Sequence, residues 1–333
     1  MSENPVKTVH SAPAENSQPT PDRSTLIAFV SFVLIGGGGA LSVRFIYGEL
    51  EPFWSGVLRF GLAALIFWLL MAIRKVSLPR GRALIGAALF GALSGTALLL
   101  MYFGLTKTPA SLFQTIAAVL PLLTLVFAAA HKLEPLRRRG VAGGLLAVTG
   151  IAIAVSGSLS TGVAVSLPHI LAIVAGAACL AEGGIVIKLF PPSHPYATNA
   201  IAMTIAASIM VVGSFLLGEA WTLPTLATTW LAMLYVVVGA TVGGFLLYLF
   251  VLKNWTATGA SYGFVLTPIV TVILATLLTD ESITLVFLAG AAVVLVGVYI
   301  GALLPAIKEP APPGEQEPIK EDIQVRPALP NCI

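Results

Sequence analysis

Charged residues are scarce in this sequence. Asp, Glu, Lys and Arg make up only 10% of its 333 residues, whereas a soluble globular domain carries about 25%. Hydrophobic residues make up 57%. The composition therefore excludes an ordinary soluble domain and indicates a protein that lies within a lipid bilayer.

Residues that commonly carry catalysis are also rare. The two cysteines, Cys179 and Cys332, are too few for a disulfide framework, and Cys332 is too close to the end of the chain for prenylation. No histidine lies well inside an apolar run, so a Ser/His protease site and a zinc site lack their parts. No Gly-rich phosphate loop is present. We expect no enzyme, no cofactor, no metal site and no ATP-driven motor. The histidines are His10, His131, His169 and His194.

Long apolar runs, in contrast, are abundant. Ten of them lie between Leu26 and Pro305, each close to the ~20 helical residues that cross a bilayer core of about 30 Å. The strands of a β-barrel would be shorter and would alternate in polarity, so helices are predicted. The expected spans are 26–46, 52–73, 83–105, 109–130, 140–158, 168–187, 197–217, 229–252, 257–279 and 284–305.

Two polar segments flank the spans. Residues 1–24 and 306–333 are rich in Pro, with Ser in the first and Glu in the second, and this composition predicts disordered tails. The first apolar run begins late, is long enough to cross the membrane and lacks a small-residue cleavage site. We therefore expect it to be a retained helix and not a signal peptide.

Basic residues between the spans predict the orientation. Most of them fall on one side of the predicted topology, which the positive-inside rule makes cytoplasmic. Both termini are then cytoplasmic, and we expect a multi-pass protein of the plasma (inner) membrane. Because topology explains these clusters, no nucleic-acid partner is expected. The basic residues on that side are Arg74, Lys75, Arg80, Arg82, Lys132, Arg137, Arg138, Arg139, Lys188 and Lys253, with Arg44 and Lys107 on the other.

A phrase containing proline and glutamate occurs twice. The segments AAVLPLLTLVFAAAHKLEP (117–135) and FVLTPIVTVILATLLTDES (264–282) place the two residues at the same separation. Several further residues align at the same offset of 147, which chance would rarely give. The aligned pairs are Pro121 with Pro268, Glu134 with Glu281, Thr124 with Thr271, Gly143 with Gly290 and Gly150 with Gly297, and nearby offsets pair Gly39 with Gly183 and Tyr102 with Tyr248.

The repeat divides the chain into two related halves, residues 26–158 and 168–305. Because each half has five spans, an odd number, the second half must enter the membrane from the opposite side. The sequence thus predicts an all-α integral membrane protein of ten transmembrane helices in two inverted five-helix repeats. Such repeats are typical of transporters that open one central site to alternate sides.

Specific phrases resemble a known family. The two-fold arrangement, VLRFGLAALIF (57–67), the repeated Ala-Ser/Thr, Pro and Glu pattern and the Gly-rich fifth and tenth spans resemble the EamA-type drug/metabolite transporter superfamily. The resemblance covers residues 26–305 and implies ten helices that move small metabolites, often by exporting amino acids or their derivatives. The chain departs from the family pattern at HKLE and TDES, where a Gly-Glu pair is common, and at GGGG (36–39), which replaces an aromatic residue.

Two charged residues lie inside the predicted spans, where charge is costly. Arg59 in span 2 is a candidate for binding an anionic group of the substrate, such as a carboxylate. Alternatively, it reaches outward to Glu49 or Glu51. Glu182 in span 6 is a candidate for proton coupling, because burial raises a carboxyl pKa. Alternatively, it has a packing role beside Gly183 and Gly184, with the acid either neutral or bonded to a neighbouring helix.

Polar and aromatic residues are further candidates for a substrate cavity. Four of them occupy equivalent places before the two repeated prolines: Gln114, Thr115, Ser261 and Tyr262. Three others, Trp54, Tyr102 and Tyr248, are either cavity residues or interfacial anchors. A mostly apolar pocket with a few hydrogen-bonding groups and one cation would suit an amphipathic metabolite.

The repeated prolines and glutamates have local interpretations. Pro121 and Pro268 each remove a backbone hydrogen bond near the middle of a span, which predicts a kink that lines the cavity and acts as a hinge, or one that only shapes packing. Glu134 and Glu281 precede helices and are expected to act as caps. Several glycines are expected to allow close helix packing: residues 36–39, Gly91, Gly95, Gly143 and Gly150. The run at 36–39 also predicts a flexible stretch.

Together these features favour a secondary transporter that exports a small amphipathic metabolite by alternating access, driven by a gradient or by exchange. The resemblance implies amino acids and their relatives as the cargo, and protons are a candidate coupling ion. An exporter of drugs or cationic compounds is the nearest alternative, although Arg59 in the cavity would argue against it. A non-transporting membrane scaffold is the alternative from another class. The sequence does not distinguish a monomer from a homodimer.

Overall fold

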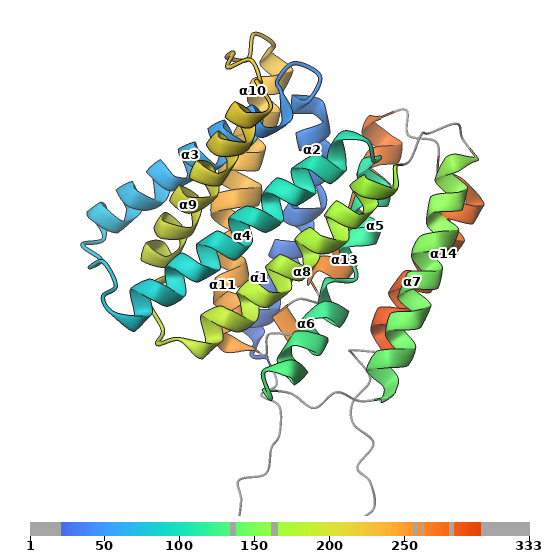
Figure 1. Ribbon diagram of the computed structural model, residues 1–333, viewed down its shortest axis with the longest axis horizontal. Helices are drawn as coiled ribbons and strands as arrows, with labels where there is room; N and C mark the ends of the chain where they lie inside the picture. Colours follow the sequence, from blue (N-terminus) through green and yellow to red (C-terminus); the bar gives the residue numbers. More distant parts are fainter. Residues whose placement is uncertain are drawn as a thin grey trace, which may run out of the picture. The chain divides into compact units, whose positions relative to one another are not determined.

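The computed structural model describes residues 21–133, 138–160, 166–255, 259–260, 263–279 and 283–300. Every regular element in these ranges is a helix (Figure 1). The elements are α1 (Arg23–Gly37), α2 (Gly39–Ile46), α3 (Pro52–Ile73), α4 (Arg82–Thr106), α5 (Ala110–Ala117), α6 (Leu120–Ala130), α7 (Arg138–Leu159), α8 (Leu167–Leu189), α9 (Pro195–Leu216), α10 (Ala227–Leu234), the π-helix η1 (Tyr235–Gly243), α11 (Gly244–Asn254), α13 (Gly263–Leu278) and α14 (Leu285–Val298).

These helices follow the predicted spans closely. Within the described residues, eight helical stretches are long and apolar enough to cross a membrane, and two shorter apolar helices, Leu266–Leu278 and Leu285–Val298, follow them. The shorter pair corresponds to the last two predicted spans, both of which extend beyond the described residues. The chain is therefore a multi-pass helical membrane protein.

Within the described residues, three spans depart from continuous α-helix in their interiors. The first is interrupted at Gly38, between α1 and α2, and the fourth at Ala118 and Val119, between α5 and α6. The eighth changes to the π-helix η1 between α10 and α11. Irregular backbone at membrane depth is tolerated where it is buried in protein or lines a cavity, and π-segments are frequent at functional sites. The interruptions therefore indicate where a site should be sought.

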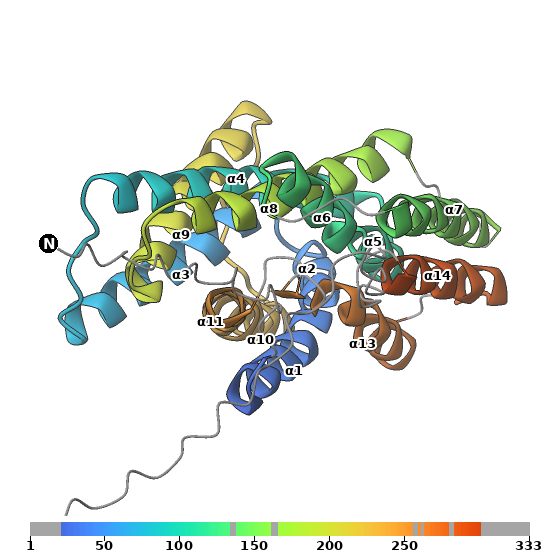
Figure 2. The ribbon, with the colours of Figure 1, turned by 90° about the horizontal axis from the view of Figure 1, so that it is seen from below.

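The principal helix contacts join the two halves of the chain. α7 packs on α14, α3 packs on α9, and α4 packs on both α8 and α9. Figure 2 shows α7 and α14 running together at one end of the helical unit, and α3, α4 and α9 at the other. The helices of each half are thus buried mainly against the other half.

Glycines allow these helices to approach closely, as the sequence predicted. A Cβ atom added at Gly91 or Gly95 of α4 would lie 2.7 or 2.9 Å from a backbone Cα atom of α9. One added at Gly150 of α7 would lie 2.6 Å from the backbone nitrogen of Val294 in α14. Real Cβ atoms do not approach other atoms so closely, so only glycine fits at these crossings.

Two loops, one from each half, cap helices of the opposite half. The Glu219 carboxylate accepts hydrogen bonds from the backbone N–H groups of Phe53 and Trp54, at 3.0 and 2.7 Å, at the start of α3. Glu49 accepts hydrogen bonds from the backbone N–H and the hydroxyl of Thr225, just before α10. A carboxylate at a helix N-terminus pairs with its unsatisfied N–H groups and its dipole. These caps hold the two loops together.

Candidate functional site

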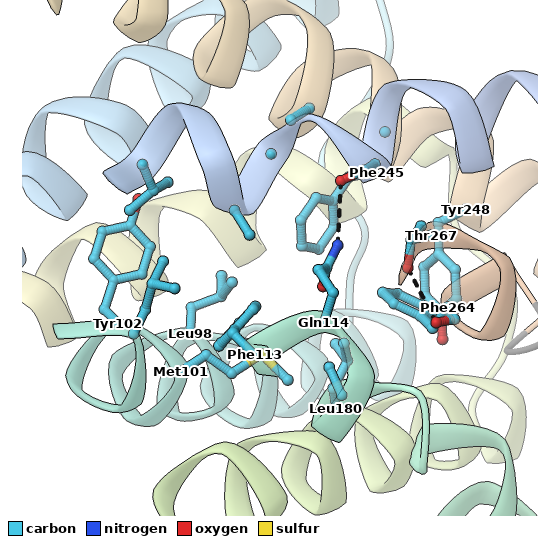
Figure 3. Close-up of a pocket in the computed structure, with 18 of the residues that line it drawn as sticks. Leu98, Met101, Tyr102, Phe113, Gln114, Leu180, Phe245, Tyr248, Phe264 and Thr267 are labelled. Atoms are coloured by element: carbon cyan, nitrogen blue, oxygen red, sulfur yellow. Dashed lines mark hydrogen bonds between the residues drawn. The ribbon is translucent and has the colours of Figure 1, made fainter. Parts of the chain in front are cut away.

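A cavity with a volume of about 150 Å³ lies between the two halves. Its wall includes residues of α1, α2, α3, α4 and α5 from the first half and of α8, η1, α11 and α13 from the second. Figure 3 shows Tyr102 at one end, the group of Tyr248, Phe264 and Thr267 at the other, and Gln114 between them. All three interrupted spans contribute to this wall.

Arg59 is the one charged side chain among the described residues that line the cavity. It is only 8% exposed. Its Nε donates a hydrogen bond to the Thr241 hydroxyl at 2.6 Å, its Nη1 donates to the Tyr102 hydroxyl at 3.3 Å, and its guanidinium lies 5.1 Å from the ring centroid of Phe60. All of these partners are neutral, so none of them balances the buried positive charge.

The alternative in which Arg59 reaches outward is not what the structure shows. Glu49 bonds to Thr225, and Glu51 forms no salt bridge with a described residue. Arg59 and Glu182 do not pair either, since Glu182 contacts His131. Arg59 is held instead by Tyr102 of α4 and Thr241 of η1, which directs its guanidinium along the cavity wall.

The π-helix explains the position of Thr241. Its hydroxyl donates to the carbonyl of Val236, five residues earlier, at 2.6 Å while accepting from Arg59. The wider turn of a π-helix matches this five-residue spacing. The second half thereby supplies an anchor for the cation of the first half.

The interrupted first span exposes backbone carbonyls, and three side chains from other elements bond to them. Tyr235 of η1 donates to the Ile35 carbonyl at 2.6 Å, and Thr271 of α13 donates to the Gly37 carbonyl at 2.5 Å. Gln114 of α5 lies 3.5 Å from the Gly36 carbonyl, as Figure 3 shows. These bonds satisfy carbonyls that the helix break leaves without their usual partners. The glycine run thus forms a defined break that is held from three sides.

The structure brings together several predicted cavity residues. Arg59, Tyr102, Gln114 and Tyr248 all line the cavity. Tyr102 and Tyr248, which the repeat pairs with each other, are 4% and 5% exposed. A Cβ atom at Gly184 would lie 2.8 Å from the Tyr248 hydroxyl, so this glycine leaves room for the tyrosine.

Other predicted cavity residues lie elsewhere. Thr115 is buried and donates to the Ser111 carbonyl of its own helix at 2.9 Å, and it is not among the described lining residues. Trp54 stacks on Trp221 with ring centroids 4.9 Å apart, and its indole N–H bonds to the Thr222 carbonyl. It therefore belongs to the contact between the capping loops, not to the described wall. Ser261 and Tyr262 lie outside the described residues.

Glu182 joins the two halves at a second place. Its Oε1 lies 2.7 Å from Nε2 of His131, which caps the C-terminus of α6. The side chains of His131 and Glu182 are 36% and 25% exposed. The other carboxylate oxygen, Oε2, is buried without a hydrogen-bond partner among the described residues. Glu182 is therefore bonded to a neighbouring helix, one of the two arrangements that the sequence allowed.

Both repeated prolines are buried in helices. Pro121 occupies the first turn of α6, directly after the interruption between α5 and α6, and Pro268 lies inside α13. Proline at the first turn needs no backbone N–H, which explains why α6 begins there. Their action as hinges stays a prediction. Glu134 and Glu281 lie outside the described residues.

Sequence reasoning missed Tyr235, Thr241, Thr267 and Thr271. Each is a hydroxyl-bearing residue within an apolar run, a pattern too common in membrane helices to single out a site. A useful signal was present in GATVGG (239–244), where glycines flank Thr241 in the same way that glycines mark the break in span 1. Only the π-helix turns this threonine toward Arg59.

Comparisons with known proteins agree with this arrangement. The family model described as the EamA-like transporter family matches twice, at residues 23–156 and 167–302. A solved crystal structure, described only as that of a protein, superposes with a TM-score of 0.65 at 20% sequence identity, covering 84% of this chain and 96% of its own. At this identity the likeness concerns the fold alone. No curated protein matches the chain.

Proposed function

The chain belongs to the EamA-like transporter family, and we propose that it is a secondary active transporter that exports a small amphipathic metabolite, such as an amino acid or a derivative, by alternating access. The observation that carries this proposal is Arg59, a buried cation on the wall of an apolar cavity whose partners among the described residues are all neutral. Burying a charge without a counter-charge is costly, and an anionic group on the cargo would offset that cost.

The helix packing supports two inverted repeats. When each span is exchanged for its equivalent in the other half, the contact of α4 with α8 becomes that of α11 with α1, and the contact of α6 with α8 becomes that of α13 with α1. All four contacts are present. The same exchange leaves the contacts of α7 with α14 and of α3 with α9 unchanged. This pattern fits ten spans related by a two-fold axis, the arrangement that lets a transporter form two equivalent states.

The distribution of basic residues supports cytoplasmic termini in the plasma (inner) membrane. Arg74, Lys75, Arg80 and Arg82 gather in and beside the connection between α3 and α4. By the positive-inside rule this end faces the cytoplasm. The loops that contain Glu49 and Glu219 then face outward.

We propose protons as the coupling ion and Glu182 as the group that carries them. Protonation would weaken the bond to His131 and thereby loosen α6 of the first half from α8 of the second. In proteoliposomes, Glu182→Gln should retain exchange of the cargo but lose its response to an imposed pH gradient. His131→Ala removes the same bond but keeps the carboxylate, so it should still respond. A Glu182→Gln protein that still follows the gradient would show that the pair is only a structural link.

The export proposal is tested by comparing spent medium from cells that overproduce the protein, the Arg59→Gln variant or an empty vector. We expect one class of organic carboxylate to accumulate outside only with the intact protein. Arg74→Gln makes the same chemical change at an exposed residue and should export normally. Equal export by Arg59→Gln would remove the binding role of Arg59. No export above the vector control would redirect the search to uptake and cationic compounds.

A further inference from the structure

The charges and rings of the cavity define its cargo more narrowly than the proposed function does. Starting from that function, we propose that the cargo is a small carboxylate with an aromatic or branched apolar body and no ammonium group. An arylalkanoic acid or a 2-oxo acid has this chemistry, and both can be deaminated derivatives of amino acids. Within the proposed class, the inference selects such derivatives over free zwitterionic amino acids.

The Arg59 end of the cavity is suited to a carboxylate. A guanidinium carries five N–H donors and stays charged, and Arg59 uses Nε and Nη1 toward the described residues Thr241 and Tyr102. The remaining donors can hold both oxygens of a carboxylate in a bidentate pair. The Tyr102 hydroxyl accepts from Arg59, so its own proton is available to the same anion.

The middle of the cavity is suited to an apolar body. Figure 3 shows Leu98, Met101 and Phe113 between Tyr102 and Gln114. A cavity of about 150 Å³ is of the size that admits a benzene-sized molecule. A phenyl ring or a branched aliphatic chain would therefore fill it.

The far end, together with Gln114 between the two ends, offers neutral polar groups. Thr267 donates to the Phe264 carbonyl of its own helix at 3.0 Å, and Gln114 donates to the Gly36 carbonyl. The Gln114 side-chain oxygen and the Tyr248 hydroxyl make no hydrogen bond with a described residue and can bond a neutral group of the ligand.

An ammonium group would meet no carboxylate on the described wall, where Arg59 is the one charged side chain. Placed beside its own carboxylate, as in an amino acid, it would also approach the Arg59 cation. An aromatic ring face attracts a cation, but less strongly than the cost of burying that cation without a counter-charge. The cavity therefore discriminates against the ammonium and in favour of the anion.

Four probes that share a phenyl ring test this inference: 3-phenylpropionate, phenylpyruvate, phenylalanine and phenethylamine. Their binding to the purified full chain in lipid nanodiscs is measured by titration calorimetry. We expect both carboxylates to bind at least about tenfold more tightly than phenylalanine, because losing or gaining one charged contact changes affinity by roughly that factor. Phenethylamine should bind most weakly.

Variants connect the preference to the site. Arg59→Gln should weaken both carboxylates at least about tenfold, the scale of a lost charged hydrogen bond, whereas Arg59→Lys should keep part of their affinity. Tyr102→Phe, which retains the ring, should weaken them less. The inference is overturned if phenylalanine binds as tightly as the carboxylates, if Arg59→Gln binds them normally, or if none of the four probes binds.

The same probes in proteoliposome counterflow separate this inference from the proposed function. If phenylalanine moves in an Arg59-dependent way and the carboxylates do not, the transporter role stands and the cargo class is wrong. If the carboxylates bind and none of the probes moves, the cargo class stands and the proposed transport of such compounds fails.

Discussion

At the scale of single residues, hydrogen bonds from side chains of both halves replace those that the interrupted first span lacks. Tyr235, Gln114 and Thr271 each reach a carbonyl of the segment from Ile35 to Gly37. A Cβ atom at Gly38 would lie 2.5 Å from the Tyr235 hydroxyl. The lack of a side chain at Gly38 thus leaves the space that the Tyr235 hydroxyl occupies.

Tyr235→Phe tests the role of this hydroxyl. The variant leaves the Ile35 carbonyl without its side-chain donor, and a buried group left unpaired costs about 1–3 kcal/mol. We expect a lower melting temperature in detergent, measured by intrinsic fluorescence. Tyr196→Phe is the matched control, since the hydroxyl of Tyr196 makes no hydrogen bond with a described residue. Equal melting of the two variants would show that the break does not need this donor.

Glu49 gives a pH-dependent contribution to stability at the contact between the loops that contain Glu49 and Glu219. Hydrogen bonds from the side chains of Thr225 and Thr229 and from the backbone of Thr225 lower its pKa from 4.5 to about 2. Because the pKa of Glu49 is lower in the folded protein than in the unfolded chain, its contribution to the stability of the fold is present above pH 4.5. This contribution is lost as the pH falls toward 2.

The melting temperatures of the wild type and Glu49→Gln should therefore differ at neutral pH and converge as the pH falls from 4.5 toward 2. Melting curves of both proteins across this range provide the measurement. Glu51→Gln, two residues away at an exposed position, should show a smaller difference from the wild type. A difference in melting temperature between the wild type and Glu49→Gln that stays constant over this pH range would contradict the lowered pKa of Glu49.

At the scale of elements, the crossing of α7 and α14 depends on glycine. Gly150→Val would place side-chain atoms against the backbone of α14, and overpacking of this kind costs about 1–3 kcal/mol or more. We expect a lower melting temperature and less folded protein in the membrane. Gly144→Val makes the same change on the same helix where an added Cβ meets no atom within 4 Å. If both variants melt together, helix propensity and not packing is responsible.

The elements themselves were largely predictable. Apolar length placed the spans, since a helix must cover the bilayer core and satisfy its own backbone. The proline phrase indicated a distortion in span 4, and the structure has one, although Pro121 begins α6 instead of kinking a continuous helix. The π-helix at Tyr235–Gly243 was not predictable, because it gains its stability from contacts with α3 and with the broken first span.

At the scale of the whole molecule, the two halves are interleaved and not separate domains. Their contacts include the loops of Glu49 and Glu219 at one end and the pair of His131 and Glu182 near the other. Alternating access requires contacts of this kind to open at one end at a time. We expect the loop contact to separate during each transport cycle.

A disulfide between cysteines introduced at Glu49 and Thr225, with Cys179 and Cys332 replaced by serine, tests this expectation. Oxidation should abolish transport in proteoliposomes, and reduction should restore it. The control pair, at Ser193 and Thr198, lies within the second half, where the hydroxyl oxygens are 2.5 Å apart, and should leave transport unchanged. Full transport by the oxidised loop pair would mean that this contact stays closed throughout the cycle.

The sequence alone determined the membrane environment, the helical class, the repeat and the presence of an arginine within a span, because hydropathy, length and spacing are local properties of the chain. It also placed Arg59, Tyr102, Gln114 and Tyr248 among the cavity candidates. The tertiary structure decided that Thr115 and Trp54 lie away from the described wall and that Glu182 pairs with His131. It also showed that Thr241 and Tyr102 orient Arg59. These are contacts between the halves, and residues far apart in the chain meet only when the helices pack.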